Sequence, residues 1–379
     1  MGILEQFDSP PSAFLQRSVQ SMILQSLNLT NFKNIGECSL EFSHKINCFL
    51  GDNGVGKSNL LDAIHFLSFC KSFAGLTDPM LIRRGEDFAI VRGHYLRRDV
   101  DEEIVAGLAV GKRKSFRRSG KEYRRLSEHI GLFPLVMVAP ADIELINGSG
   151  EVRRRFLDMV ISQGDARYLE ALIRYNRTLT QRNSMLRDGI ADTSLYMAVE
   201  MQMDMSADYI RRVRAERVDR LSEIFGRYYA EISGTRETPR LTYRSHLSDG
   251  VTLAGLLAAN RERDRILRHT SVGIHRDDVE MTLDDMPARQ TASQGQSKTY
   301  TIALRFAQYE FLREVTAMSP LLLLDDIFDK LDAGRVERIM RIVATDTFGQ
   351  IFVTDTNRRH LDEIIALTGG SDSIWSVVG

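Results

Sequence analysis

An octapeptide near the N-terminus has the residue types that bind phosphate. Residues 51–58 read Gly-Asp-Asn-Gly-Val-Gly-Lys-Ser and complete the pattern G-x-x-x-x-G-K-[ST]. The glycines let the backbone wrap around a polyphosphate, with amides pointing inward at a helix N-terminus whose partial positive charge favours an anion. We expect Lys57 to reach the β- and γ-phosphates and Ser58 to offer its hydroxyl to Mg²⁺. The octapeptide therefore predicts a nucleotide site.

The segments on either side of this phosphate-binding loop fit the same prediction. Residues 46–50 are typical of a strand, and after the loop Leu60, Leu61, Ile64 and Leu67 recur at helical spacing. An ordinary glycine turn before a helix would explain the glycines but not the Lys-Ser pair. The predicted nucleotide contacts are Gly51, Asp52, Asn53, Gly54, Val55, Gly56, Lys57, Ser58 and Asn59.

A second chemical segment lies at residues 320–332, where four leucines precede two carboxylates. Such an apolar run is typical of a strand buried on both faces of a parallel sheet. We expect Asp325 to orient Mg²⁺ or its water and Asp326 to polarise the attacking water, with Lys57 as the other catalytic residue. A buried strand followed by a helix with Asp caps would give the same pattern. The upstream phosphate loop favours the catalytic interpretation.

The third segment, residues 292–298, reads Ala-Ser-Gln-Gly-Gln-Ser-Lys and precedes an apolar helix face. Ser293 and Gly295 stand where a helix begins, so a hydroxyl and free amides are available for a γ-phosphate. We include Gln296 with them as a nucleotide contact. Taken alone the segment is weak, because any polar helix start has this appearance.

The order of the three segments resembles the ABC-type ATPases. In that class the signature helix, which here begins at residue 293, faces the phosphate loop of a second copy. The resemblance therefore implies an ATP-dependent homodimer in which the γ-phosphate adds charge-assisted contacts across the interface. Hydrolysis removes those contacts, and the dimer is expected to open.

Blocks along nearly the whole chain resemble one branch of this class, the RecF family of recombination-repair proteins. The loop and the carboxylates are general to ABC ATPases, whereas the blocks at 153–158 and 273–278 are far more specific to RecF. The blocks that carry the resemblance are residues 27–34, 51–58, 71–73, 139–142, 153–158, 273–278, 293–296, 325–326 and 351–356.

The RecF resemblance implies an ABC head without long coiled-coil arms and a weak, DNA-dependent ATPase. It also implies ATP-dependent dimerisation on DNA, whether duplex, gapped or at a junction of single and double strands. The implied partners are RecR and RecO, which with RecF place RecA at single-stranded gaps during recombinational repair, replication restart and the SOS response. These partners come from the resemblance alone.

Several positions depart from the wider ABC pattern. Asp326 stands where most transporters carry Glu, and its shorter side chain fits slow turnover. Asp329 stands where Ser is commoner, which can alter contacts across the dimer. Residues 354–356 read Thr-Asp-Thr where transporters place a histidine. No glutamine can be named for the loop that senses Mg²⁺, so nucleotide binding is the firmer prediction and the hydrolysis rate stays open.

Composition sets outer limits on the function. The 379 residues carry a net charge of −1, with 43% hydrophobic and 27% charged residues, as in a globular protein. No overall basic field indicates nucleic acid, so DNA binding would need local patches. Cys38, Cys48 and Cys70 lack metal spacing and suit reduced thiols in a cytosol. No segment approaches the length of a membrane span.

One local patch is strongly basic. Residues 112–125 hold eight cations against a single acid, Glu122, and indicate a hairpin that turns at Ser119–Gly120 with Phe116 and Tyr123 interleaved. Such a hairpin could lie along DNA phosphates. It could equally be a solvated edge that its charge keeps from aggregating. The candidate DNA contacts are Lys112, Arg113, Lys114, Arg117, Arg118, Lys121, Arg124 and Arg125.

The placement of these motifs predicts an α/β ATPase head with an inserted, mostly helical second lobe. Residues 22–142 would form the first half of the head, 143–260 the helical lobe and 261–379 the second half. Residues 1–21 lack the features of a signal peptide and are interpreted as a disordered extension or a start codon assigned too early.

Three other functions stay open at this level. The motor subunit of a membrane transporter would need a separate permease, and the basic hairpin argues against it. A defence ATPase coupled to a nuclease would need an appended domain with clustered acids, which the sequence lacks. A clamp gated by nucleotide binding, with incidental hydrolysis, would share every motif.

Overall fold

The computed structural model describes residues 19–234, 237–329, 331–368 and 373–376. Its centre is a five-stranded parallel sheet in the order β14-β3-β13-β12-β8. The chain therefore builds one sheet from strands that lie far apart in sequence, and β3 pairs with β14, 326 positions further along. The strands are β3 (Ile46–Leu50), β8 (Leu135–Val138), β12 (Leu321–Asp325), β13 (Ile351–Asp355) and β14 (Ser373–Ser376).

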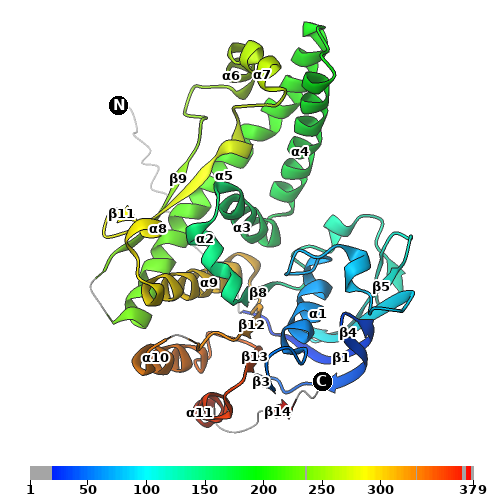
Figure 1. Ribbon diagram of the computed structural model, residues 1–379, viewed down its shortest axis with the longest axis vertical. Helices are drawn as coiled ribbons and strands as arrows, with labels where there is room; N and C mark the ends of the chain where they lie inside the picture. The colour runs from blue at the N-terminus through cyan, green and yellow to red at the C-terminus, as the bar shows by residue number, and fades with distance from the viewer. Residues whose placement is uncertain (1–18, 235–236, 330, 369–372, 377–379) are drawn as a thin grey trace, which may run out of the picture.

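The leucine run of β12 lies in the middle of this sheet, as the sequence predicts. Leu321 and Leu323 point into one hydrophobic core, and Leu322 and Leu324 into another. Successive side chains of a strand point to opposite faces, so a strand between two cores needs apolar residues at every position. Figure 1 shows the two layers that supply these cores. On one side of the sheet lie α1 (Lys57–Phe69) and β4 (Phe88–Arg97), and on the other α9 (Gln294–Thr316) and α10 (Ala333–Val343).

The first core lies between the parallel sheet, helix α1 (Lys57–Phe69) and a six-stranded antiparallel sheet. The predicted apolar face of α1 is confirmed, because Leu60, Leu61, Ile64 and Leu67 are all buried. The antiparallel sheet has the order β2-β1-β4-β5-β6-β7. Its strands are β1 (Met22–Phe32), β2 (Ile35–Glu41), β4 (Phe88–Arg97), β5 (Val100–Ala109), β6 (Ser115–Arg118) and β7 (Lys121–Glu122).

A helical lobe is inserted between β8 and β12. Its long helix α5 has 41 residues, or roughly 60 Å at about 1.5 Å per residue. Figure 1 shows α4 and α5 rising side by side from the sheets, with α6 and α7 at their far end. The helices of this lobe are α2 (Glu144–Asn147), α3 (Gly150–Gly164), α4 (Ala166–Arg187), α5 (Thr193–Ser233), α6 (Leu253–Ala259) and α7 (Arg261–Leu267).

The lobe differs in two details from the predicted helical segment 143–260. Helix α7 carries the helical region to Leu267, and residues 239–244 form a strand, β9, within it. In β9, Pro239 and Leu241 are buried while Arg240 between them is exposed. This alternation is typical of a strand, but it covers too few residues to be recognised in the sequence. This strand pairs with β10 (Asp278–Leu283), and β10 pairs with β11 (Met286–Pro287).

The chain then returns to the head. Helix α9 packs against α5 and β8, and the helices α10 and α11 follow β12 and β13. Of residues 1–21, residues 1–18 lie outside the described part, but the backbone of Gln20 is hydrogen-bonded to Ala317 and Ser319 and so belongs to the fold. The remaining elements are α8 (Ala288–Thr291), α9 (Gln294–Thr316), α10 (Ala333–Val343), α11 (Arg358–Thr368), η1 (Asp78–Leu81), η2 (Leu126–Glu128), η3 (Pro140–Ile143) and η4 (Ile274–Arg276).

A network of ion pairs joins α3 and α5 of the helical lobe to the start of β10. Arg214 of α5 binds Asp158 of α3 (2.9 Å) and Asp277 beside β10 (3.1 Å), and Arg153 donates to both carboxylate oxygens of Asp278 (2.8 Å each). Arg214 and Asp277 are both buried, and removing one partner of a buried pair leaves an uncompensated charge, which costs about 3–5 kcal/mol. The two RecF-like blocks therefore contact each other here through ion pairs. Within the described residues, no helix is both long and apolar enough to cross a membrane.

Candidate nucleotide-binding site

The phosphate-binding loop joins β3 to α1, as predicted. Gly54 (φ 86°) and Gly56 (φ 116°) adopt backbone angles that side chains disfavour, so these two positions need glycine. Lys57 opens the helix, and its side chain folds across the loop. Its ammonium donates to the carbonyl oxygens of Gly51 (2.5 Å) and Asp52 (2.9 Å). The loop thus holds a largely buried cation at the N-terminus of a helix, which is the electrostatic requirement for binding a polyphosphate.

Asn34, from the turn between β1 and β2, braces this loop. Its amide donates to the carbonyl oxygen of Val55 (3.3 Å) and its oxygen accepts from Asn59 (2.8 Å). A side chain at position 56 would place its Cβ 3.0 Å from the Asn34 amide, so Gly56 is also required by this close approach. Asn34 belongs to the RecF-like block 27–34, and the sequence predicts no role for it.

A pocket of about 520 Å³ opens beside the loop. Asn34 and Asn59 form one part of its wall, and cations and apolar side chains form the rest. No sequence motif indicated it, because its lining comes from three separate segments. The lining residues are Lys33, Asn34, Asn59, Leu76, Met80, Ile82, Arg83 and Arg84.

The two predicted carboxylates lie at the carboxyl edge of the parallel sheet, next to the loop. The Ser58 hydroxyl donates to Asp325 Oδ1 (2.8 Å), and so does the hydroxyl of Thr354 from the neighbouring strand β13 (2.7 Å). The backbone amide of Asp326 donates to the same Thr354 hydroxyl (3.1 Å). One threonine therefore orients both aspartates. The sequence had marked residue 354 only as a position without histidine.

Oxygen donors at this edge suit Mg²⁺. The Ser58 hydroxyl and the Asp325 carboxylate are adjacent, and Mg²⁺ is typically held by one or two carboxylates together with substrate phosphates and water. Among the described residues, no group of three or more His, Cys, Asp or Glu side chains is arranged to hold a metal alone. The donor set thus fits a metal that arrives with a nucleotide.

Asp326 has the environment of a general base. Partial burial raises its pKa, and the nearby carboxylates of Asp355 and Asp325 raise the pKa further, whereas Lys57 lowers it. A higher pKa makes a carboxylate a stronger proton acceptor near neutral pH. Its φ of 51° is unusual for a residue with a side chain and sets it off from the strand.

A histidine lies near this edge, although not directly after the strand, where transporters carry theirs. His360 of α11 lies 2.8 Å, through Nδ1, from Asp355 Oδ2, and its ring contacts that of Phe328 edge to face. Asp355 in turn is one of the carboxylates that act on Asp326. His360 lies five residues beyond the strand and contacts Asp355 from the first turn of a helix, so the residues directly after the strand give no sign of it.

The signature segment forms the N-terminus of α9. The Ser293 hydroxyl accepts from the backbone amide of Gln296 (3.2 Å), and the Gln296 side chain accepts from the Ser293 amide (2.7 Å). The Gln296 amide also donates to Glu237 (2.6 Å). At Gly295 an added Cβ would lie 2.6 Å from Nη1 of Arg335, so this guanidinium lies directly against the helix tip.

The structure brings residues 51–59 together with Asp325 and Asp326, but it does not bring the signature segment beside them. In Figure 1 the start of α9 lies at the left of the molecule, whereas α1 lies at the right. The N-terminus of α9, which carries Ser293, Gly295 and Gln296, therefore lies apart from the phosphate loop.

The basic hairpin is present, with its turn at Ser119 (φ 46°) and Gly120 (φ 80°). Two of its eight cations are occupied inside the protein, because Lys114 binds Asp78 (2.8 Å) and Arg118 binds Glu102 (2.6 Å). The aromatic residues are also turned inward. Phe116 is buried and the Tyr123 hydroxyl is 3.0 Å from His129 Nδ1.

The candidate DNA contacts therefore narrow from eight to six. All six are exposed, and in the described part of the chain none has an ion-pair partner. They are Lys112, Arg113, Arg117, Lys121, Arg124 and Arg125.

His275, from the second RecF-like block, does not lie at the phosphate loop. Its Nδ1 is 2.8 Å from the Tyr175 hydroxyl and its Nε2 is 3.1 Å from the Thr270 carbonyl oxygen. Burial lowers its pKa to about 4, which keeps the ring neutral. It joins α4 to the segment that precedes β10.

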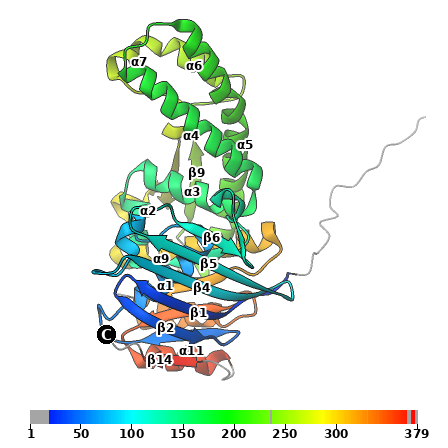
Figure 2. The same ribbon diagram turned by 90° about the vertical axis from the view of Figure 1, so that its right-hand side faces the viewer.

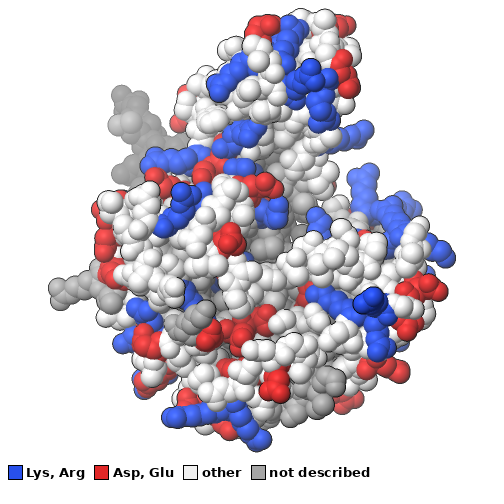
Figure 3. Space-filling model, in the orientation of Figure 1, with Lys and Arg blue, Asp and Glu red and all other residues white. Residues whose placement is uncertain are grey.

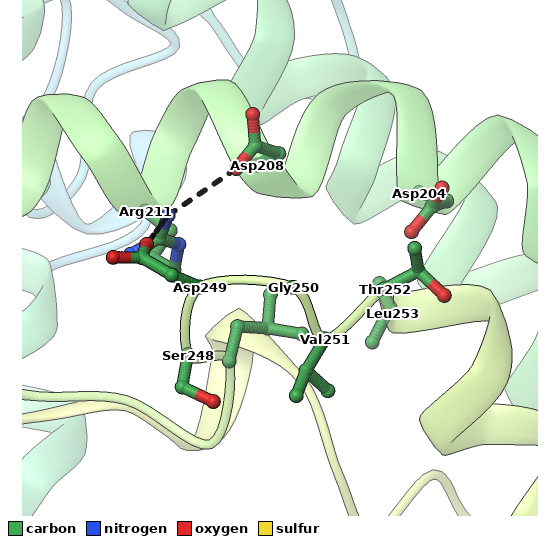
Figure 4. A pocket seen from close by; sticks show the side chains of 10 residues that line it. Asp204, Asp208, Arg211, Ser248, Asp249, Gly250, Val251, Thr252 and Leu253 are labelled. Atoms are coloured by element: carbon green, nitrogen blue, oxygen red, sulfur yellow. Dashed lines mark hydrogen bonds and ion pairs between the residues drawn. The ribbon is translucent and has the colours of Figure 1, made fainter.

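A smaller pocket of about 330 Å³ lies on the helical lobe, between α5 and residues 247–253 (Figure 4). Its acids are largely paired within the protein. Arg211 binds Asp208 (3.4 Å) and Asp249 (2.9 Å), and Asp204 accepts from the Ala254 amide (3.1 Å). These contacts hold the loop on the helix.

Comparisons with known proteins identify the family. The model of the "RecF/RecN/SMC N terminal domain" matches residues 23–372. The chain is 52% identical over 344 residues to the DNA replication and repair protein RecF of Parabacteroides distasonis, covering 91% of this chain and 94% of that protein. The chain belongs to the RecF family. The RecF of Bacteroides thetaiotaomicron is 47% identical over 358 residues, which cover 94% of this chain and 97% of that protein.

Solved structures agree with this assignment. A structure of the recombination mediator protein RecF with ATP, described in the RecFOR pathway, has a TM-score of 0.82 and 31% identity over 89% of this RecF-family chain and 94% of that one. The Smc head domain of Pyrococcus furiosus has a TM-score of 0.54 and 18% identity over 90% of this chain and 91% of that one, which shows the shared ATPase-head fold alone. The family favours a repair protein over a transporter motor.

Proposed function

We propose that this RecF-family chain is a DNA-dependent ATPase of recombinational repair that dimerises on DNA with ATP. The observation that carries the proposal is the hydrogen bond between the Ser58 hydroxyl and Asp325, because it places the phosphate loop and the carboxylate strand in one site. Residues 51–59 hold the phosphates of ATP, and Ser58 and Asp325 hold Mg²⁺. When bound, the metal offsets negative charge on the phosphate oxygens.

Two residues of the chain carry out the hydrolysis of ATP. Lys57 is displaced from the carbonyl oxygens of Gly51 and Asp52 toward the phosphates, where its charge stabilises the transition state. Asp326 accepts the proton of the attacking water, and its raised pKa supports this role. Turnover is weak because the short aspartate must reach a water at the far side of the γ-phosphate.

The second protomer completes the site. Its α9 tip presents the Ser293 hydroxyl and the amides at Gly295 and Gln296 to the γ-phosphate, and a 23-residue helix favours an anion at its start. Capping already orients the Ser293 and Gln296 side chains, so little ordering is needed on dimerisation. ATP then joins two protomers, and hydrolysis releases them.

DNA is the proposed macromolecular partner, through the six unpaired cations of the hairpin. RecR and RecO are proposed as protein partners and RecA as the recombinase that is placed at gaps, in the cytoplasm. The support for these is family membership, together with the RecFOR pathway named for the solved relative.

ATP hydrolysis and oligomer size test the proposal together. Hydrolysis is measured with and without gapped duplex DNA, and sedimentation velocity is run with ATP, with ADP and without nucleotide. We expect dimers with ATP alone and faster hydrolysis with DNA. Hydrolysis that ignores DNA would instead favour the transporter or clamp alternatives, and a monomer that hydrolyses ATP unaided would exclude a shared site.

A further inference from the structure

The basic hairpin lies at the edge of the antiparallel sheet that is nearest to the helical lobe. The sheet order ends in β5-β6-β7, and Figure 2 shows β2, β1, β4, β5 and β6 stacked upward toward α3 and α4. Helix α4 rises above this edge on the side that faces the viewer. The hairpin and α4 therefore lie on the two sides of the notch between head and lobe that the space-filling view in Figure 3 shows.

The outer face of α4 carries cations that the fold does not use. The inner face, with Tyr168, Tyr175 and Arg182, is buried against the rest of the lobe. Arg174 and Arg177 are exposed on the outside, and no ion pair to either occurs in the described ranges. A single exposed acid, Glu170, lies one turn away. In contrast, the arginines of α5 that face its surface are paired, as Arg211 and Arg212 are with Asp208.

Figure 3 shows the notch at the right of the molecule, with Lys and Arg side chains standing on both of its walls. Unpaired cations repel one another, and a fold with a net charge of −1 has enough acids to pair them. These cations lie on two facing surfaces, so they would fit a ligand that carries negative charge on more than one side. A DNA duplex carries about one charge per 1.7 Å of its axis, on two strands.

We propose that duplex DNA lies in this notch, contacting the hairpin on one wall and Arg174 and Arg177 of α4 on the other. The inference rests on the proposed DNA binding and adds the second wall. A duplex offers a phosphate backbone to each wall, whereas a single strand would meet only one. The helical lobe then takes part in binding DNA.

Anisotropy of a labelled 30-base-pair duplex, with the full-length protein and ATP, tests this proposal. The Arg174→Glu/Arg177→Glu variant should bind at least tenfold more weakly. The neutral Arg174→Gln/Arg177→Gln variant should reduce the slope of log affinity against log salt by about 1.8, at about 0.9 for each lost phosphate contact. A control with an equal change in net charge is Arg358→Glu/Arg359→Glu on α11; because these arginines pair with Asp362 and Glu363, its unfolding midpoint and ATP binding are measured alongside.

The outcomes separate the two proposals. If wild-type protein binds no DNA with ATP, the proposed function fails. If it binds, Lys121→Glu/Arg125→Glu abolishes binding and the α4 variants behave as the α11 control, DNA lies on the hairpin alone and the notch is excluded. Equal competition by polyglutamate of matched charge, or tighter binding of a single strand than of the duplex, also overturns the proposal.

A photo-crosslink reports the geometry independently of charge. Ile173, next to Arg174, is 47% exposed and accepts p-benzoylphenylalanine without loss of a buried contact. We expect this position to crosslink to the duplex. Met205 of α5, 79% exposed on another face of the lobe, is the control position and should not. Crosslinks at position 205 but not at 173 would place DNA on another surface.

Discussion

Ser58 and Asp325 are 267 positions apart in the chain, yet the serine hydroxyl donates a 2.8 Å hydrogen bond to the aspartate carboxylate. Ser58 lies in the first turn of α1, and Asp325 ends the central strand β12. The bond closes the phosphate loop against the sheet edge where Thr354 also binds. The whole candidate site depends on this junction.

Thr354 is predicted to be a positioning residue for both aspartates. Thr354→Val keeps the shape but removes the hydroxyl that binds Asp325 (2.7 Å) and the Asp326 amide (3.1 Å). We expect kcat to fall about tenfold, as for the loss of about 1.4 kcal/mol of hydrogen bonding. Steady-state kinetics with varied Mg²⁺ measure it. Thr354→Ser should recover most of the rate, and an unchanged kcat in the valine variant would remove the role.

Lys57→Ala should abolish dimerisation driven by ATP. The substitution removes the cation that the loop holds beside Gly51 and Asp52, and with it the attraction for the β- and γ-phosphates. Sedimentation velocity at saturating ATP gives the oligomer size, and the unfolding midpoint without nucleotide serves as the control for folding. A variant that still forms dimers with ATP would show that the phosphate contacts of this loop do not hold the dimer together.

Asp326→Asn should trap the ATP-bound dimer. The amide cannot accept the proton of the attacking water, while its size leaves the binding contacts in place. We expect hydrolysis to fall by a factor of 10² or more and the dimer to persist for hours after ATP is added. Finding this variant monomeric with ATP would take Asp326 out of the hydrolytic role.

Gly295→Ala should weaken the dimer without weakening the fold. The new Cβ would meet Arg335 Nη1 at 2.6 Å, so the guanidinium must move away from the α9 tip. Alanine suits a helix, and the free energy of unfolding should change by less than about 1 kcal/mol. Dimer dissociation constants with ATP give the readout, and Arg335→Ala in the same protein tests whether relieving the contact restores association. Wild-type association of Gly295→Ala would argue against a signature tip in the interface.

Acid should destabilise the protein through its buried histidines. Burial is the main reason why the pKa values of His65 and His129 are lowered to about 4, from an ordinary value of 6.5. Between pH 6.5 and 4 these histidines are therefore protonated in the unfolded chain but not in the native state. The free energy of unfolding therefore falls as pH decreases through this window. Each group contributes a slope of up to about 1.4 kcal/mol per pH unit.

Urea unfolding at pH 7.5, 6.0 and 5.0 measures this slope. His129→Gln retains a donor for the Leu67 carbonyl oxygen, to which His129 Nε2 is hydrogen-bonded at 2.6 Å, but no longer titrates. Its stability should depend less steeply on pH than that of the wild type. Equal slopes in the two proteins would show that His129 is not a source of acid sensitivity.

Local patterns predicted the elements that carry the chemistry. The strand Ile46–Leu50, the helix after the loop, the leucine strand and the hairpin turn at Ser119–Gly120 all lie where expected. Each depends on near neighbours: glycine angles, helical spacing, or burial on both faces of a strand. Side-chain partners escaped prediction because they come from distant segments. Asn34, Thr354 and His360 meet their partners only after the sheet has formed.

The basic hairpin shows the same division within one segment. Its eight cations and its turn were evident from spacing, yet Lys114 and Arg118 were counted with the other six. The folded structure distinguishes Lys114 and Arg118 from the others, because their partners, Asp78 of η1 and Glu102 of β5, come close only after folding. The inward turn of Phe116 is decided in the same way, by the core that closes over it.

Residue types and their order were enough to predict a phosphate-binding loop, a carboxylate strand and a resemblance to the RecF family, because motif chemistry depends on local sequence. Which groups lie together could be learned only from the folded chain. Packing of sheets and helices sets the distances between remote segments, so it places Ser58 against Asp325 and the N-terminus of α9 apart from the phosphate loop.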